Sequence, residues 1–194
     1  MSKKRKERRN TATSYIAFLR GINNIGHKTV KMDELKRIFE ANGFQNVKTI
    51  LSSGNIVFET PMLETAVLIT KTEKQLEKKL GYKVDVVLRT LDELQLLVKS
   101  NPFNKIKITP RTKLLLTFLS EEKISRLKIP HKSPAKNFTI IRISGNEIYS
   151  VVNLLPNKRP YRIISFLEKE FGKKITTRNW STIVKIVTHN FYDI

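Results

Sequence analysis

The order of apolar patterns between residues 14 and 90 limits this chain to a small number of folds. Short runs rich in aliphatic and aromatic residues, which are typical of strands, alternate with segments in which apolar residues recur at helical spacing. The strand-like segments are 14–21, 47–60 and 83–90, the second of them interrupted at Ser53-Gly54-Asn55, and the helical segments are 31–43 and 63–80. The order strand, helix, strand, strand, helix, strand predicts a split βαβ, or ferredoxin-like, lobe.

A similar order follows residue 100, after a short helix that we expect at 92–99. We expect a strand at 113–120, one turn of helix at 121–127, a hairpin over 137–152 and a helix over 159–172, without a last strand. The second hairpin turns at Ser144-Gly145-Asn146, which repeats the first turn after 91 residues. The fold class predicted is therefore α+β, with two related ferredoxin-like lobes at 13–100 and 101–194, in which helices pack on antiparallel or mixed sheets.

The end of the chain is expected to be a helix. Trp180, Ile183, Val184 and Val187 recur at helical spacing, and Thr176 or Thr177 is available to cap the helix start. Aromatic residues at this spacing are most often part of a core, so we expect Trp180 to be a packing residue.

The chain is strongly basic, with 37 Lys and Arg against 17 Asp and Glu and a net charge of +20. Residues 1–12 show no apolar periodicity and are predicted to be a disordered basic arm. The cations of this arm are Lys3, Lys4, Arg5, Lys6, Arg8 and Arg9. Most of the excess charge belongs to the body of the protein. Such charge attracts polyanions without reading sequence, although a lysine-rich surface without any function is the alternative.

Several classes of function lack the residues that they need. The chain has no Cys, which excludes disulfides, thiolate zinc sites and a cysteine nucleophile. Its three histidines have no metal-ligand spacing, and no GxSxG motif is present, so we expect no metal and no cofactor. No apolar run approaches the roughly 20 residues of a membrane span, which predicts a cytoplasmic protein without a membrane partner.

The first strand-like segment, YIAFL at 15–19, is apolar on both faces. Both faces of its sheet are therefore expected to be covered. A sheet covered in this way cannot serve as the base-stacking platform of an RNA-recognition module. We exclude that form of RNA binding.

Polar side chains gather where two of the predicted strands end and a helix begins. Arg20 and Asn23 follow the first strand, Ser53 and Asn55 lie in the turn after the second, and Lys31 starts the first helix. The first two strands of a split βαβ sheet run parallel, so their ends should meet on one rim. Arginine, amide and hydroxyl donors beside a helix N-terminus are suited to a phosphate or carboxylate.

The same residues have a structural alternative. Arg20 can pair with a carboxylate or with loop carbonyls, and Asn23 and Asn55 are common turn residues. Neither a Walker loop nor a dinucleotide fingerprint is present. If the rim does bind a ligand, Arg178 and Asn179 of the tail are candidates to close over it.

Three motifs, FLRGINNIGHKTVKMDEL, SSGNIVF and TTRNWSTIVKI, resemble the bacterial domain-of-unknown-function family 1697. The resemblance extends from about Tyr15 to His189. It implies an α+β fold with ferredoxin-like lobes and no established activity. The chain departs from the family pattern at Asn24, Ile25, Ser52 and Ser181, and a residue other than glycine at position 25 makes the first loop stiffer.

Three functions remain open, and the sequence does not decide whether the protein is an enzyme or what its oligomeric state is. Charge favours a non-catalytic anion-binding protein that holds nucleic acid non-specifically through the arm and the body. The second is an enzyme or receptor for a phosphorylated or carboxylated small molecule at the rim. Its predicted ligand-binding residues are Arg20, Asn23, Lys31, Ser53, Asn55, Arg178 and Asn179. The third is a structural or oligomer-forming protein whose motifs hold two lobes together.

Overall fold

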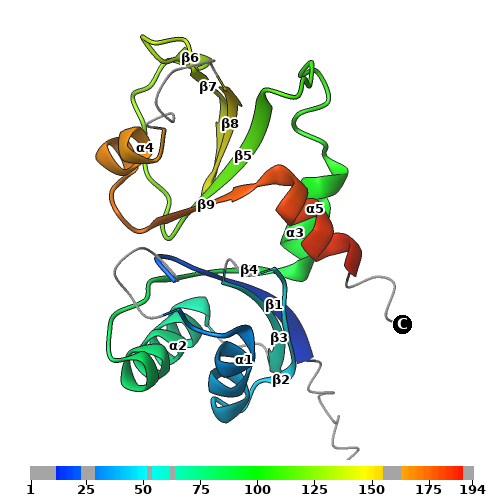
Figure 1. The fold of residues 1–194 in the computed structure, drawn as a ribbon, viewed down its shortest axis with the longest axis vertical. Helices are drawn as coiled ribbons and strands as arrows, with labels where there is room; N and C mark the ends of the chain where they lie inside the picture. Colours follow the sequence, from blue (N-terminus) through cyan, green and yellow to red (C-terminus); the bar gives the residue numbers. More distant parts are fainter. Residues whose placement is uncertain (1–11, 23–28, 52–53, 62–63, 155–162, 190–194) are drawn as a thin grey trace, which may run out of the picture.

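The computed structural model describes residues 12–22, 29–51, 54–61, 64–154 and 163–189. Within them the chain forms two antiparallel sheets and five helices, which confirms the predicted α+β class (Figure 1). The predicted arm, apart from Ala12, and the predicted site residues Asn23 and Ser53 lie outside the described residues.

The first sheet has the strand order β2-β3-β1-β4, and its neighbouring strands are all antiparallel. Its strands are β1 (Ala12–Leu19), β2 (Gln45–Thr49), β3 (Asn55–Pro61) and β4 (Val86–Thr90), and its helices are α1 (Met32–Ala41) and α2 (Thr65–Leu80). We call this unit the first lobe. The element order predicted for it is confirmed.

Strand β1 is buried on both faces, as its composition predicted. Tyr15, Ala17 and Leu19 belong to the core beneath α1 and α2, whereas Ile16 and Phe18 point to the opposite face. That opposite face is covered by the second half of the chain. Because successive side chains of a strand point to opposite faces, β1 contributes to two separate cores.

From the sequence, the helical spacing of Ala66, Ile69, Leu76 and Leu80 predicts one buried stripe on α2, and the observed stripe differs from it. Ala66 is exposed, and the buried series is Leu68, Thr72 and Leu76, at intervals of four residues. Thr72 enters the core because its hydroxyl donates to the Leu68 carbonyl at 2.7 Å, which satisfies its hydrogen-bonding capacity.

The second sheet has the strand order β6-β7-β8-β5-β9 and is also antiparallel. Its strands are β5 (Thr112–Leu119), β6 (His131–Lys132), β7 (Phe138–Ser144), β8 (Glu147–Asn153) and β9 (Ile175–Asn179), and helix α4 (Ile163–Phe171) covers one face. We call this unit the second lobe.

Two predictions for the second lobe are wrong. The helical turn expected at 121–127 is irregular, because Ile124 is fully exposed and a single turn of helix without an apolar stripe is marginal. A final strand, β9, is present where Thr176 and Thr177 were expected to cap a helix. The β-branched residues at 175–177 favour a strand, which extends the sheet beyond β5.

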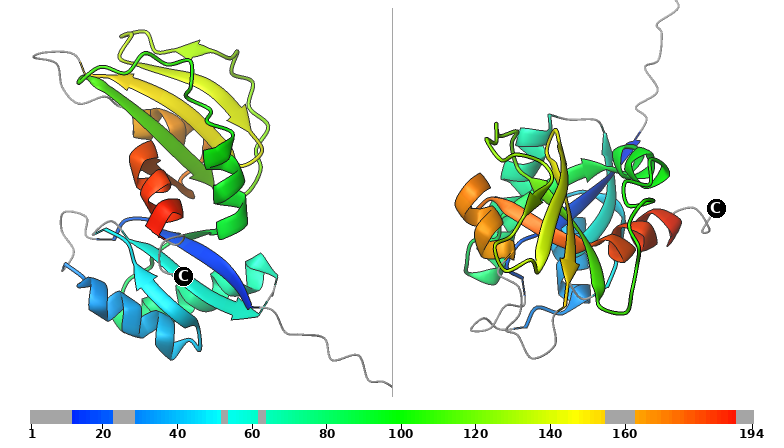
Figure 2. Two further views of the ribbon diagram at one scale, coloured as in Figure 1. Left: turned by 90° about the vertical axis from the view of Figure 1, so that its right-hand side faces the viewer. Right: turned by 90° about the horizontal axis from the view of Figure 1, so that it is seen from above.

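Helices α3 (Leu91–Lys99) and α5 (Trp180–His189) lie side by side between the two sheets (Figure 2). They close a core to which both lobes contribute. Phe18 of β1 stacks on Phe118 of β5 with ring centroids 4.5 Å apart, and both side chains are fully buried. The helix predicted at 92–99 and the helical character of the tail are confirmed. None of the described helices is both long and apolar enough to cross a membrane.

Candidate functional site

The end of β1 meets the bend between β2 and β3, as expected from the parallel course of the first two strands. The amide of Leu19 donates to the carbonyl of Gly54 at 2.8 Å, and Phe18 is paired with Asn55 in the β1–β3 register. Asn55 is fully buried, and its amide nitrogen donates to the Ile50 carbonyl at 2.9 Å. This rim is therefore a tightly bonded corner of the first lobe.

Arg178 of β9 reaches this corner from the second lobe. Its Nε donates to Asn55 Oδ1 at 2.6 Å, and its Nη2 donates to the Leu19 carbonyl at 2.8 Å and to the Gly54 carbonyl at 3.5 Å. We call Arg178 with these three partners the interlobe lock. It joins residues from all three sequence motifs.

The other contacts of Arg178 orient the guanidinium. Nη1 donates to Thr176 Oγ1 at 2.7 Å and to the Thr177 carbonyl at 3.0 Å, and the group lies 5.5 Å from the centroid of the Phe18 ring. Burial lowers the pKa of Arg178 to about 10, which still leaves it cationic at neutral pH. These partners are neutral oxygens, so the positive charge is spread over several hydrogen bonds.

Gly54 allows the turn to approach the end of β1 closely because it has no side chain. Its φ is +68°, and a Cβ at this position would lie 2.7 Å from Cγ2 of Ile22 and 3.0 Å from Cβ of Leu19. Ile22 of the first motif thus occupies the space that a side chain at position 54 of the second motif would need.

Replacing Gly54 with alanine is expected to lower the free energy of unfolding by about 1–3 kcal/mol, because the side chain adds a steric clash to an unfavourable φ. Gly145→Ala is the matched control, since Gly145 occupies the equivalent turn at a φ of +53° and its Cβ would meet nothing closer than 3.8 Å. Urea unfolding of both variants measures the difference. Equal losses would show that the contact with Ile22 has no energetic role.

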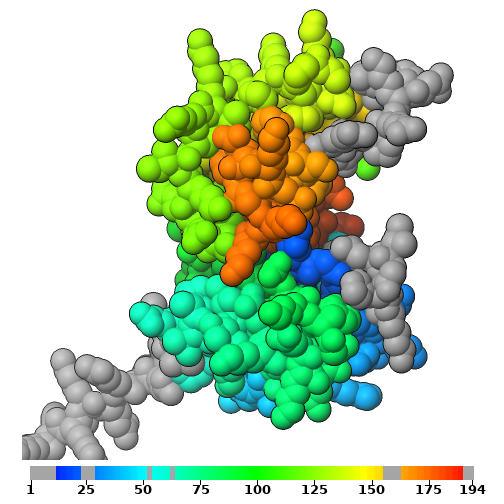
Figure 3. Space-filling model, turned by 90° about the vertical axis from the view of Figure 1, so that its left-hand side faces the viewer, coloured from blue at the N-terminus to red at the C-terminus, as the bar shows by residue number. Residues whose placement is uncertain are grey.

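Arg20 lies at the boundary between the lobes and is partnered by two carboxylates. Its Nη1 is 3.3 Å from Asp85 Oδ2, and its Nη2 is 2.6 Å from Glu168 Oε1 on α4. Figure 3 shows α4 against the segment that leads into β4 on this face of the molecule. The sequence left this pairing open as an alternative to ligand binding.

The other described site residues lie apart from the lock. Lys31 is exposed at the N-cap of α1, where its carbonyl accepts hydrogen bonds from Glu34 and Leu35. Asn179 is exposed at the end of β9, where it lines a different hollow beside α5. The structure therefore brings Arg178 to Asn55 but leaves Asn179 outside the corner.

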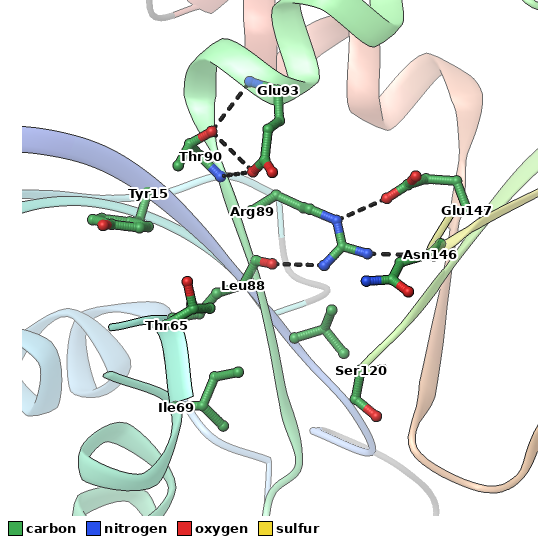
Figure 4. Close-up of a pocket in the computed structure, with 11 residues that line it drawn as sticks. Tyr15, Thr65, Ile69, Leu88, Arg89, Thr90, Glu93, Ser120, Asn146 and Glu147 are labelled. Carbon is green, nitrogen blue, oxygen red and sulfur yellow. Dashed lines mark hydrogen bonds and ion pairs between the residues drawn. The ribbon is translucent and has the colours of Figure 1, made fainter. Parts of the chain in front are cut away.

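A cavity of about 560 Å³ lies between the lobes beside β4, and Arg89 is central to it (Figure 4). The Nε of Arg89 donates to Glu147 Oε1 at 2.8 Å, and its two terminal nitrogens donate to the carbonyls of Leu88, Leu119 and Asn146 at 2.7–3.3 Å. Arg89 is thus a second arginine that bonds the two lobes together.

The carboxylates that line this cavity are engaged in similar contacts. Glu147 accepts from Arg89, and Glu93 accepts from the backbone and hydroxyl of Thr90 in the capping box of α3. Among the described residues, no group of three His, Asp or Glu side chains is arranged to hold a metal ion. The cavity combines charged groups that already have partners with apolar walls such as Ile69 and Val87.

Sequence reasoning missed Arg89, Asp85, Glu147 and Glu168. Arg89 carried a signal, because an arginine within the apolar segment VVLRT needs a partner once that strand is buried. The partners Glu147, Glu168 and Asp85 carried no such signal, since they lie 58 or more residues from their arginines.

The comparisons with known proteins agree with this fold. A model of the family described as "Protein of unknown function (DUF1697)" matches residues 12–149, which contain the first two motifs. The solved structure of the conserved bacterial protein SP0830 from Streptococcus pneumoniae is similar, with a TM-score of 0.65, 20% identity, and coverage of 92% of this chain and 98% of that chain. At this identity the likeness supports the fold alone.

A search of curated proteins gave no match. The family match extends over most of the chain, which therefore belongs to the DUF1697 family of proteins of unknown function.

Proposed function

We propose that the protein is a non-catalytic binding protein that holds nucleic acid without sequence specificity through its basic surface. The observation that carries this proposal is the uneven distribution of charge. Residues 101–194 contain 18 Lys and Arg against six Asp and Glu, a net charge of +12, whereas residues 12–100 carry only +3. The predicted arm adds a further cationic segment.

The exposure of the cations in the second lobe supports this role. Lysines and arginines at 113, 126, 128, 132, 136, 142, 169, 173, 174 and 185 are all exposed. None of them forms an ion pair with a carboxylate of the described residues. Solvent-facing cations of this kind neutralise phosphates and release counterions, which gives an affinity that depends on salt rather than on sequence.

The contacts of the family motifs favour a structural role for them. Arg178 and Asn55 are partners within the interlobe lock, and Arg20 is held by two carboxylates. A phosphorylated or carboxylated small molecule at the rim would have to displace these bonds. The small-molecule alternative is therefore less well supported, and the charged exterior remains the better candidate surface.

Binding of labelled oligonucleotides, measured by fluorescence anisotropy at two salt concentrations, tests the proposal. We expect binding at about 50 mM salt and an affinity at least about tenfold weaker at about 200 mM, because even two phosphate contacts produce that dependence. No binding at the lower concentration, or an affinity that is independent of salt, would contradict the proposal.

Paired charge reversals locate the surface. Lys173→Glu with Lys174→Glu is expected to weaken binding more than Lys78→Glu with Lys79→Glu, since each pair is adjacent and exposed but only the first lies in the basic second lobe. Equal effects would show that the second lobe is not the preferred surface.

Two finer assignments accompany this proposal. The strand order of the first lobe and its β-α-β-β-α-β order support a ferredoxin-like class for that lobe, and the second lobe departs from it by replacing the first helix with an irregular segment and β6. The absence of Cys supports a reducing, cytoplasmic location.

A further inference from the structure

We infer that a groove beside Trp180 accepts a base of single-stranded nucleic acid, so that the protein prefers single strands to duplexes. This inference rests on the proposed function and assigns a position to it. The groove lies along the start of α5 and the beginning of β5, and we call it the Trp180 groove. Its cavity volume is about 650 Å³.

The walls of the Trp180 groove are mostly apolar. Leu114 of β5, Trp180 and Val184 of α5, and Ile108 of the preceding loop form them, and Ile108 is 66% exposed. Ile108 and the half-buried Trp180 thus form an apolar surface that is in contact with water in the free protein. Its size falls in the range of roughly 300–1,000 Å³ that is typical of small-molecule pockets.

The indole of Trp180 is held in place. Its ring meets Phe103 edge to face, with centroids 5.2 Å apart, and it packs on the core shared by the two lobes. The prediction that Trp180 is a packing residue thus describes one part of its surface, while another part lines the groove. A fixed aromatic ring offers stacking at a low cost in side-chain entropy.

The charge around the groove identifies the ligand as an anion. The two chain segments that build it, 94–120 and 171–189, contain no Asp or Glu. They carry exposed cations at Lys105, Lys107, Arg111, Lys113 and Lys185, two of which line the groove. None of the five forms an ion pair with a carboxylate of the described residues.

An apolar hollow with a cationic rim matches a nucleotide in a single strand. The base is a flat ring that fits an aromatic and aliphatic wall, and the neighbouring phosphates need cations within a few ångströms. A base within a duplex is already stacked and paired, so it cannot enter the hollow unless it is flipped out of the helix. Asn179, exposed on the groove wall, adds amide donors and an acceptor for a base edge.

The fluorescence of Trp180 tests the inference directly, because the chain has a single tryptophan. The full-length protein is titrated with a thymidine oligomer of about 12 nucleotides, a length within the usual site size of a single-strand binding fold, and with a duplex of equal length. We expect quenching of the tryptophan emission by the single strand and little change with the duplex. Trp180→Leu should weaken single-strand binding about tenfold and leave duplex binding unchanged.

Two further double variants test the groove without changing the partly buried Trp180. Lys113→Glu with Lys185→Glu changes two exposed groove residues, and Lys132→Glu with Lys169→Glu changes two exposed lysines elsewhere in the second lobe. The groove pair should weaken single-strand binding more than duplex binding, whereas the control pair should weaken both alike.

The outcomes separate the two proposals. If neither oligonucleotide binds at low salt, the proposed function fails and this inference fails with it. If both bind with unchanged tryptophan emission, or if the groove pair behaves like the control pair, nucleic-acid binding stands but the Trp180 groove is not its site.

Discussion

Replacing Arg178 with alanine is expected to lower the free energy of unfolding by about 2–4 kcal/mol, since several charge-assisted hydrogen bonds are lost together. The buried Asn55 Oδ1 loses a donor at 2.6 Å, and the Leu19 carbonyl loses a donor at 2.8 Å. Arg178→Lys should recover only part of the loss, because a single ammonium group cannot reach the partners of a planar guanidinium. Urea unfolding followed by circular dichroism measures the change.

Arg37→Ala provides the control for this prediction. Arg37 is exposed on α1, and its removal should change stability by no more than about 0.5 kcal/mol. A loss of less than about 1 kcal/mol for Arg178→Ala would contradict the interlobe lock, because the loss of several charge-assisted hydrogen bonds costs more than that. The position of Arg178 would then matter for a ligand rather than for folding.

The lock gives the three distant motifs of this chain a common structural role. The first motif supplies Leu19 and Ile22, the second supplies Gly54 and Asn55, and the third supplies Arg178. Each element alone has an ordinary local role at a strand end or a turn. Together they fix the position of the second lobe on the first. This is a structural requirement of the fold, and it is compatible with any function of the surface.

Much of the first lobe could be predicted from the sequence, because its signals are local. The period of two in β1, the helical spacing in α1 and the Ser-Gly-Asn turn each depend on a few neighbouring residues. The meeting of the end of β1 with the Asn55 turn at one edge also followed, since strand direction in this topology is limited. Local pattern and tertiary packing agree here.

The missed features depend on contacts that are distant in sequence. Strand β9 forms because β5 offers it an open edge, and its own residues, with two threonines, were equally suited to cap a helix. Arg89 finds Glu147 across the lobe boundary, 58 residues away. No pattern within a short window contains either partner, so the network of arginines between the lobes becomes evident only from the three-dimensional structure.

The second large effect on stability is expected in the core that both lobes share. Replacing Phe18 with alanine is expected to lower the free energy of unfolding by about 3–5 kcal/mol, because a fully buried aromatic side chain leaves a cavity. The loss should affect both lobes at once, since Phe18 stacks on Phe118 and lies beneath the guanidinium of Arg178. Phe18→Leu should retain most of the stability because it keeps more of the volume.

Two probes decide whether the lobes unfold together. Trp180 fluorescence reports on the side of α5, and circular dichroism reports on both sheets, so coincident urea transitions in the wild type indicate one cooperative unit. Phe18→Ala should shift both transitions, whereas Ile124→Ala, which removes a fully exposed side chain, should shift neither by more than about 0.5 kcal/mol. If Phe18→Ala moves only one of the two probes, the lobes fold independently. The stack between β1 and β5 would then be a contact between separate domains rather than part of a common core.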